Sequence, residues 1–206
     1  METLKKLGLL FCLLLLVVSP SAQNRAERQA AFHKSYDAER SNKYSLAINE
    51  LKKVYDAEDY FANIRLGWLH YLDKQHDSAK EYYAKAIKLK PYSIEARFGL
   101  IKPLSAQEDW AGVKEQYLEI LKIDPQNTLA NYWLGVIFYN AADYTQAEKR
   151  FEKVVNLYPL DYDSVVILGW TKLNLGKYQE AKVMFEHALT LKPGDESSLE
   201  GLKLIK

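Results

Sequence analysis

The sequence has 206 residues, of which 48% are hydrophobic and 27% charged, and its formal net charge is +1. A chain of this length holds one ordinary domain or one array of short repeats. Its balanced charge argues against nucleic acid or an anionic membrane surface as the main partner, and its single cysteine excludes an internal disulfide.

Residues 1–22 have the pattern of a secretory signal peptide. Lysines precede an unbroken apolar run, 7–18, which is too short to span a bilayer, and small residues follow up to Ala22. We expect cleavage near Ala22, although Pro20 fits a cleavage site poorly and an uncleaved anchor is the alternative. The mature chain, 23–206, would then be one exported domain in the periplasm or elsewhere in the cell envelope, without a transmembrane helix.

Most of the mature chain repeats with a period of 34 residues, which predicts an array of helical units. Prolines, small residues and aromatic residues share this spacing independently. They are Pro91, Pro125, Pro159 and Pro193; Ala79, Val113, Ala147 and Ala181; and Tyr83, Tyr117, Phe151 and Phe185. If each unit ends two residues after its proline, the regular units are 60–93, 94–127, 128–161 and 162–195. A degenerate unit, 28–59, precedes them, and a short tail, 196–206, follows.

Further motifs mark both helices of each unit. A Leu-Gly pair occurs at Leu66-Gly67, Leu134-Gly135 and Leu168-Gly169; an aromatic turn residue at Tyr44, Trp110, Tyr144 and Tyr178; and a small residue at Ala47, Ala79, Ala147 and Ala181. In these motifs the chain resembles the tetratricopeptide repeat family over nearly all of its mature length. The resemblance implies an all-α fold: a right-handed α-solenoid of five helix-turn-helix units with a C-terminal capping helix, eleven helices in total.

The residues that recur at fixed positions of the units can also be explained by helix packing, without the family resemblance. Residues 4, 7, 8 and 11 of a unit share one face of its first helix, and residues 20, 24 and 27 share one face of its second. We expect the glycines of the Leu-Gly pairs to lie opposite the small residues of the second helix, so that the two backbones approach closely. The prolines should end the second helices, and we expect N-caps for the helices that follow at Ser93, Asn127, Asp161 and Asp195. Leu199, Leu202 and Ile205 form a capping stripe in the tail.

The chain carries no motif for catalysis, cofactor binding or metal binding. Its four histidines, His33, His70, His76 and His187, do not cluster, and none has a cysteine or a paired carboxylate at ligand spacing. The sequence has no P-loop, Gly-rich dinucleotide turn, nucleophile elbow or HExxH motif. We therefore expect a protein that is not an enzyme and has no cofactor.

An additional apolar stripe remains once the faces within each unit are assigned. In tetratricopeptide repeat proteins the first helices line the concave face, and residues 2, 5, 9, 12 and 13 of a unit commonly point into it. The stripe at these positions consists of Phe32, Tyr36, Ile64, Trp68, Tyr71, Phe98, Tyr132, Val136, Tyr139, Val166, Trp170 and Leu173, with Lys102 as its one cation. It either packs between neighbouring first helices or forms an exposed aromatic groove for a partner.

The chemistry of this stripe limits the kind of partner. Family members that bind acidic C-terminal peptides use Lys and Asn there, whereas the fifth residues here are Phe32, Ile64, Phe98, Tyr132 and Val166. We expect a scaffold that binds an extended apolar peptide or an amphipathic helix. The alternative is a glycan-binding module, or an accessory subunit of an envelope polysaccharide or secretion assembly, because such aromatic side chains also stack on sugars. A small enzyme or its dedicated subunit is a third hypothesis.

The third unit, 94–127, departs from the pattern. Pro103 lies inside its predicted first helix, where we expect a kink or a break, and bulky Ile101, Val113 and Ile120 replace small residues. We expect this unit to open its helix pair and to change the curvature of the groove. The alternative is a harmless kink that the neighbouring units hold in place.

Overall fold

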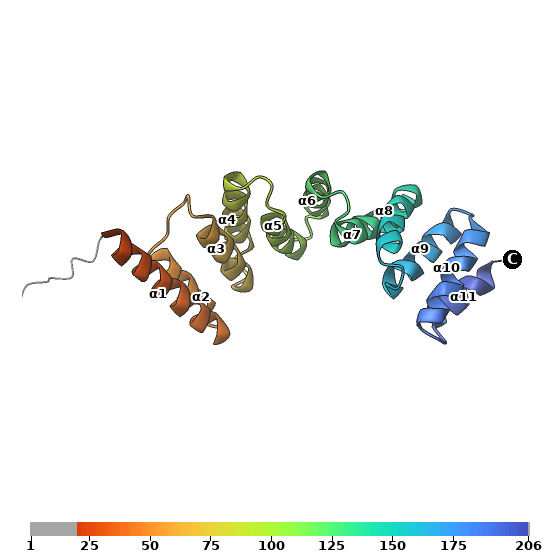
Figure 1. The fold of residues 1–206 in the computed structure, drawn as a ribbon, viewed down its shortest axis with the longest axis horizontal. Coiled ribbons are helices and arrows are strands. Elements are labelled where there is room, and N and C mark those ends of the chain that lie inside the picture. The colour runs from red at the N-terminus through yellow and green to blue at the C-terminus, as the bar shows by residue number, and fades with distance from the viewer. Residues whose placement is uncertain (1–19, 206) are drawn as a thin grey trace, which may run out of the picture.

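The structure, a computed structural model, describes residues 20–205, which form eleven α-helices in one array (Figure 1). They are α1 (Pro20–Arg40), α2 (Tyr44–Lys52), α3 (Tyr60–Leu72), α4 (His76–Leu89), α5 (Ile94–Ala106), α6 (Trp110–Ile123), α7 (Thr128–Asn140), α8 (Tyr144–Leu157), α9 (Tyr162–Asn174), α10 (Tyr178–Leu191) and α11 (Glu196–Leu204). Each helix packs against the one before it and the one after it. The predicted solenoid of five helix pairs and a capping helix is confirmed.

The array is an arch in the view of Figure 1. The first pair, α1 and α2, and the last three helices, α9 to α11, bend to the same side of the middle units, so the arch has an inner and an outer side. None of the helices within 20–205 is both long and apolar enough to cross a bilayer.

The first helix begins at Pro20, eight residues before the predicted start of the first unit at Arg28. The added segment, 20–27, includes Ala26 and Glu27, which are strong helix formers. The predicted signal peptide, 1–22, lies outside the described residues apart from its last three, which form the first turn of α1.

Prolines and capping residues set the ends of the helices. The second helices α4, α6, α8 and α10 each end two residues before the proline of their unit. Ser93, Asn127 and Asp195 cap the next helix as predicted, since their side chains accept hydrogen bonds from the backbone N–H groups of Ala96, Ala130 and Ser198. The prediction is wrong for Asp161. Its carboxylate accepts a hydrogen bond from the Ser164 hydroxyl at 2.5 Å and makes no bond to the helix backbone.

The turn inside every unit uses a residue in the left-handed region. The φ angles are +59° at Lys74, +59° at Glu108, +57° at Ala142 and +73° at Gly176, and the first unit has the same feature at Asn42. Only one of these five residues is glycine. The left-handed conformation is unfavourable for a residue with a Cβ, so the packing of the two helices, rather than the preference of the turn residue, fixes this geometry.

Helix α5 continues through Pro103 to Ala106, so the prediction of a broken helix is wrong. Pro103 lies one turn from the end of the helix and is less than 2% exposed. Its missing N–H removes one hydrogen bond close to the end of the helix, and the side chains around it hold the segment in place. The irregularity of the third unit therefore has another origin.

The capping helix α11 buries small residues. Ser198 and Gly201 are buried, whereas Leu199, which we expected in the capping stripe, is 41% exposed and Leu202 and Ile205 are half-buried. The face of α11 that meets α10 lies against the ring of Phe185, where a Cβ on Gly201 would overlap the ring. A larger residue at this position would keep α11 from reaching the end of the array.

Candidate partner-binding surface

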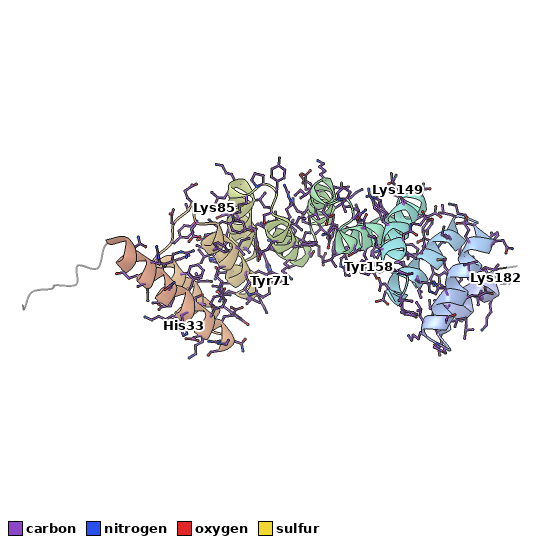
Figure 2. The ribbon with its side chains drawn as sticks, viewed as in Figure 1. His33, Tyr71, Lys85, Lys149, Tyr158 and Lys182 are labelled. Atoms are coloured by element: carbon purple, nitrogen blue, oxygen red, sulfur yellow. The ribbon has the colours of Figure 1, made fainter. Side chains whose placement is uncertain are left out.

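The predicted stripe lies on the first helix of every unit, and none of its side chains is buried. Tyr36 on α1 is 48% exposed and Lys102 on α5 is exposed. The other members are half-buried: Phe32 on α1; Ile64, Trp68 and Tyr71 on α3; Phe98 on α5; Tyr132, Val136 and Tyr139 on α7; and Val166, Trp170 and Leu173 on α9. Figure 2 shows Tyr71 on the inner side of the arch and Lys149 on the outer side.

Trp68 makes contacts with both neighbouring units. Its Nε1 donates a hydrogen bond to Glu39 Oε1 on α1 at 2.6 Å, and its ring centroid lies 5.7 Å from that of Tyr71. From the other side, the Lys102 ammonium on α5 lies 5.5 Å from the ring, within the range of a cation–π interaction. Trp68 therefore helps to join three units while part of its side chain stays open.

Trp170 has a similar role at the C-terminal end. Its Nε1 donates a hydrogen bond to Ser197 Oγ on α11 at 2.8 Å, and its ring meets Phe185 edge to face at 5.3 Å. Tyr139 on α7 accepts a hydrogen bond from the Asn174 amide on α9 at 3.5 Å, and burial raises the pKa of its hydroxyl. Each of these aromatic residues has one edge in a contact between units and leaves the rest half-open.

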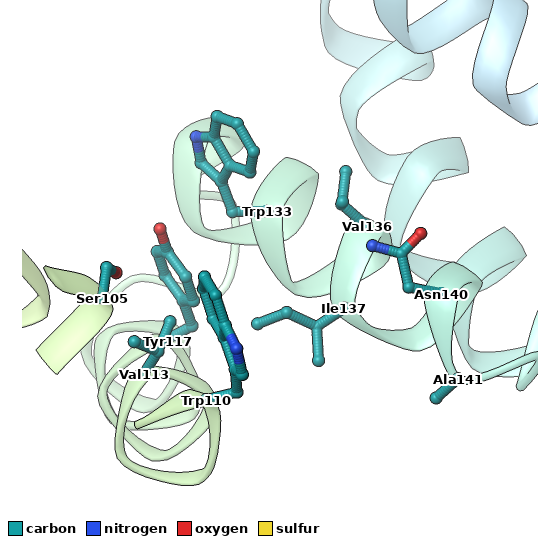
Figure 3. A pocket seen from close by; sticks show the side chains of 9 residues that line it. All are labelled: Ser105, Trp110, Val113, Tyr117, Trp133, Val136, Ile137, Asn140 and Ala141. Atoms are coloured by element: carbon teal, nitrogen blue, oxygen red, sulfur yellow. The ribbon is translucent and has the colours of Figure 1, made fainter. Parts of the chain in front are cut away.

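An apolar cavity of about 670 Å³ lies between α6 and α7 (Figure 3). Its lining consists of Ser105 on α5; Trp110, Val113 and Tyr117 on α6; and Trp133, Val136, Ile137, Asn140 and Ala141 on and just after α7. No charged side chain lines it, and Val136 is the one member of the predicted stripe that it includes. We call it the α6–α7 cavity.

At the junctions around Tyr83 and Phe185, glycines flank an aromatic ring on both sides. Tyr83 on α4 has Gly67 of its own unit at one edge, where a Cβ would come within 3.0 Å, and Gly99 of the next unit at the other, where a Cβ would overlap the ring. Phe185 on α10 has Gly169 and Gly201 in the same two places. The glycines of the Leu-Gly pairs are thus required by the ring of the second helix as well as by the close approach of two backbones.

At the α6–α7 junction both glycines are replaced. The matching residues around Tyr117 are Ile101 in its own unit and Trp133 in the next. The tenth residue of the unit differs in burial as well: Leu69 and Thr171 are fully buried at this position, whereas Ile137 is only half-buried. The side chains of Ile101 and Trp133 keep the two helices from closing on the ring of Tyr117 as the glycines allow around Tyr83, and the space beside Tyr117 stays open as the α6–α7 cavity.

A second hollow of about 630 Å³ lies on the other side of Trp133, which lines both spaces. Its lining consists of Thr128, Leu129, Tyr132, Trp133, Val154, Tyr158, Asp161 and Asp163. We call it the Tyr158 hollow. Tyr158 is 57% exposed and lies on the inner side of the arch (Figure 2). The hollow therefore adjoins the predicted groove at Tyr132.

Periodicity identified Trp110 only as a turn aromatic and did not single out Trp133 or Ile137. The signal was nevertheless present in the sequence. At the junctions that follow units 60–93, 128–161 and 162–195, the eighth residue of the unit or the sixth residue after the junction is a glycine, whereas after unit 94–127 these residues are Ile101 and Trp133. Trp133 belongs to one unit and Ile101 to the unit before it. An alignment of the units with one another therefore does not show that these two residues meet at one junction.

One buried ionic cluster joins α8, α9 and α10. The Lys172 ammonium lies 2.8 Å from Glu148, 2.8 Å from Glu152 and 2.5 Å from Glu180. Burial disfavours its charge, but the hydrogen bonds to these carboxylates outweigh burial and raise the pKa of Lys172. Three carboxylates this close could hold a cation, and the Lys172 ammonium already fills that role. The cluster thus stabilises the junction between the last two units.

Comparisons with known proteins agree with this architecture. Residues 62–93, 129–161 and 162–195 each match a family model described as tetratricopeptide repeat. A tetratricopeptide repeat protein from Parabacteroides merdae has a TM-score of 0.72 at 18% identity, over 87% of this chain and 72% of that one. MamA gives 0.69 at 18% identity, over 81% and 92%. YrrB, described as a TPR protein with an unusual peptide-binding site, gives 0.68 at 17% identity, over 89% and 96%. No curated protein sequence matches the chain.

Proposed function

The chain belongs to the tetratricopeptide repeat family, and from this premise we propose that it is a non-enzymatic scaffold that holds a segment of another protein along its inner face. Proteins of this fold are protein-interaction scaffolds. The observation that carries the proposal is the incomplete burial of the stripe: it has aromatic residues on five successive first helices, and none of them is buried. A contiguous apolar surface of this kind marks an interaction site.

The residues of the stripe favour an apolar or amphipathic partner segment. Tyr and Trp provide a large contact area at low entropic cost, and a few such anchors supply most of the energy of an interface. Lys102 is the only charged member of the stripe. The segment that binds here would therefore contribute apolar side chains, with at most a local acidic contact at Lys102.

We place this scaffold in an exported compartment. The support is the pattern of residues 1–22, in which a basic start, a short apolar run and small residues follow one another. A fusion of these 22 residues to a reporter enzyme that is active only after export tests this part of the proposal by itself. Cytoplasmic retention of the fusion would contradict it.

The glycan alternative has less support than the peptide. Sugar rings stack on free aromatic faces, whereas Trp68 and Trp170 both use their Nε1 groups and part of their rings in contacts with neighbouring units. A titration of the tryptophan fluorescence with cell-wall polysaccharide separates the two. A saturable response would favour the glycan.

Site-specific photo-crosslinking in the native cell tests the scaffold directly. The photoreactive residue replaces Tyr36, Lys102 or Tyr139 on the inner face, and the exposed Lys149 on α8 serves as the outer-face control. We expect one crosslinked protein species from the inner-face positions and none from Lys149. Equal yields from both faces would count against the groove.

A further inference from the structure

The α6–α7 cavity and the Tyr158 hollow form a continuous surface around Trp133 that the regular repeat does not need. We propose that this surface is the anchoring site for the partner: it takes an amphipathic segment with one bulky apolar side chain in the α6–α7 cavity, a second in the Tyr158 hollow, and a lysine or arginine beside Asp161 and Asp163. The inference rests on the proposed function, because it gives the chemistry of the segment that the scaffold holds.

The first support is that the cavity follows from particular residues. Unfilled apolar volume destabilises a protein in proportion to its size, and the junctions around Tyr83 and Phe185 show that the same repeat can close on its rings. Two substitutions relative to that pattern, at Ile101 and Trp133, open the junction. An occupant that fills the cavity would recover the lost burial when it binds.

The second support is the exposed apolar surface around the two spaces. Trp110 is 57% exposed, Trp133 45%, Leu129 51% and Tyr158 57%, and all four line one or both of them. Tryptophan and tyrosine dominate the energetic centres of protein interfaces. By contrast, Gly67 and Gly99 lie against the ring of Tyr83 at the closed junction, in the places that Ile101 and Trp133 take around Tyr117.

The third support is the distribution of charge. The α6–α7 cavity has no charged side chain in its lining, whereas the Tyr158 hollow ends at Asp161 and Asp163. Among the described residues, neither carboxylate forms an ion pair. Both lie near Tyr132, whose pKa is raised by burial and then by these two charges. A basic residue next to two apolar anchors complements this arrangement.

The shape of the surface favours a polypeptide over a free small molecule. The lining of the α6–α7 cavity is mostly apolar and has no charged side chain, and the cavity shares Trp133 with the adjoining hollow. A small ligand would occupy one space and leave the acidic end unpaired. An amphipathic segment laid across Trp133 satisfies both spaces and both carboxylates.

The test starts from a displayed library of random linear peptides selected on the immobilised chain. We expect the enriched peptides to combine two bulky apolar residues with a lysine or arginine. Their affinity, measured by fluorescence anisotropy, should fall at least about tenfold with Trp133→Gly, Trp110→Ala or the double substitution Asp161→Asn and Asp163→Asn. Trp133→Gly restores the residue found at Gly99 and Gly201, so a folded array is expected, and circular dichroism checks this for each variant.

Two matched controls accompany these variants. Tyr178 is the exposed aromatic residue of the last unit at the position that Trp110 has in the third, and Tyr178→Ala removes it. Glu196→Gln removes an exposed carboxylate from the first turn of α11. Both should leave the affinity within about twofold.

The possible failures are distinguishable. If the enriched peptides lose affinity with Tyr36→Ala and Tyr139→Ala but not with the cavity variants, the scaffold stands and the anchoring site is wrong. If no peptide is enriched, both proposals fail. Enrichment of acidic peptides contradicts the charge argument. A last outcome is that the cavity binds a small molecule and not a peptide. The apolar dye anilinonaphthalene sulfonate tests this. If the dye binds the chain and Trp133→Gly abolishes that binding, while no peptide depends on Trp133, the inference is overturned.

Discussion

The junction between the second and third units and the junction between the third and fourth are built from the same elements and differ in how they close. At the first, Gly67 and Gly99 flank the ring of Tyr83. At the second, bulkier residues flank Tyr117 and leave the α6–α7 cavity. The closure of a junction is thus set by two side chains from different units, and the prolines and turns that mark the repeat do not affect it.

The largest expected effect comes from forcing the closed junction open. Gly99→Leu places a branched side chain where even a Cβ overlaps the Tyr83 ring. Overpacking of this kind should lower the free energy of unfolding by about 3 kcal/mol, as measured by urea denaturation. Ala106→Leu, at an exposed position on the same helix, is the control and should change little. Equal effects of the two variants would show that the glycine is not needed for packing.

The same large residue should have opposite consequences at the tenth residue of two units, Leu69 in the second and Ile137 in the fourth. Leu69→Trp overfills a site that is fully buried and should cost about 2 kcal/mol of unfolding free energy. Ile137→Trp places the same ring in a cavity of about 670 Å³ and should cost less than about 0.5 kcal/mol, or stabilise the chain. The difference between the two values is the quantity to measure. Similar costs would mean that the cavity closes in solution.

Acid should weaken the α3–α4 pair without affecting the α6–α7 cavity. Burial lowers the pKa of His70, which stacks on Tyr82 and contacts Gln75 at 2.7 Å. A lowered folded-state pKa means that the unfolded chain takes up the proton first. The stability is therefore complete above the ordinary histidine pKa of about 6.5 and is lost as the pH falls below it.

Thermal unfolding at neutral and mildly acidic pH measures this loss, and His70→Gln should remove part of it. Tyr117 is the one titratable side chain in the lining of the α6–α7 cavity, and burial raises its pKa, so the affinity of a peptide anchored only there should not change over the same pH range. A parallel fall in that affinity would place a titrating group at the cavity.

The smallest effect concerns the turns, which are alike at closed and open junctions. Ala142 has a φ of +57°, so Ala142→Gly should stabilise the chain by about 1 kcal/mol. Ala141→Gly, at the preceding residue with a φ of −84°, is the matched control and should be neutral or destabilising. Thermal denaturation of both variants compares them. Stabilisation by both would indicate an effect on the unfolded chain rather than relief of the left-handed turn.

Much of the fold could be predicted from the sequence because more than one residue type marks each helix boundary of the repeat. A proline ends α4, α6, α8 and α10, and Ser93, Asn127 and Asp195 cap the helices that follow. Asp161 failed as a cap because the hydroxyl of Ser164 competes for its carboxylate. Pro103 failed to break α5 because it lies in the last turn, where little of the helix depends on the lost hydrogen bond.

The candidate site was only partly predictable. Periodicity located the stripe, because solvent-facing and buried positions alternate regularly along each first helix. It could not locate the α6–α7 cavity, which depends on how Ile101 and Trp133 meet Tyr117 across two units. The third unit was correctly singled out as irregular: its helices α5 and α6 pack against each other less extensively than the two helices of any other unit, and the α6–α7 cavity lies between it and the next unit.

The central claim is that Ile101 and Trp133 hold the α6–α7 junction open, and a distance measurement tests it most directly. Spin labels on Glu115 of α6 and Thr145 of α8, both exposed, report the separation across the junction by double electron–electron resonance. The double substitution Ile101→Gly and Trp133→Gly restores the glycines of the closed junctions. The account predicts that the distance distribution shifts to shorter values in this variant. An unchanged distribution would contradict it.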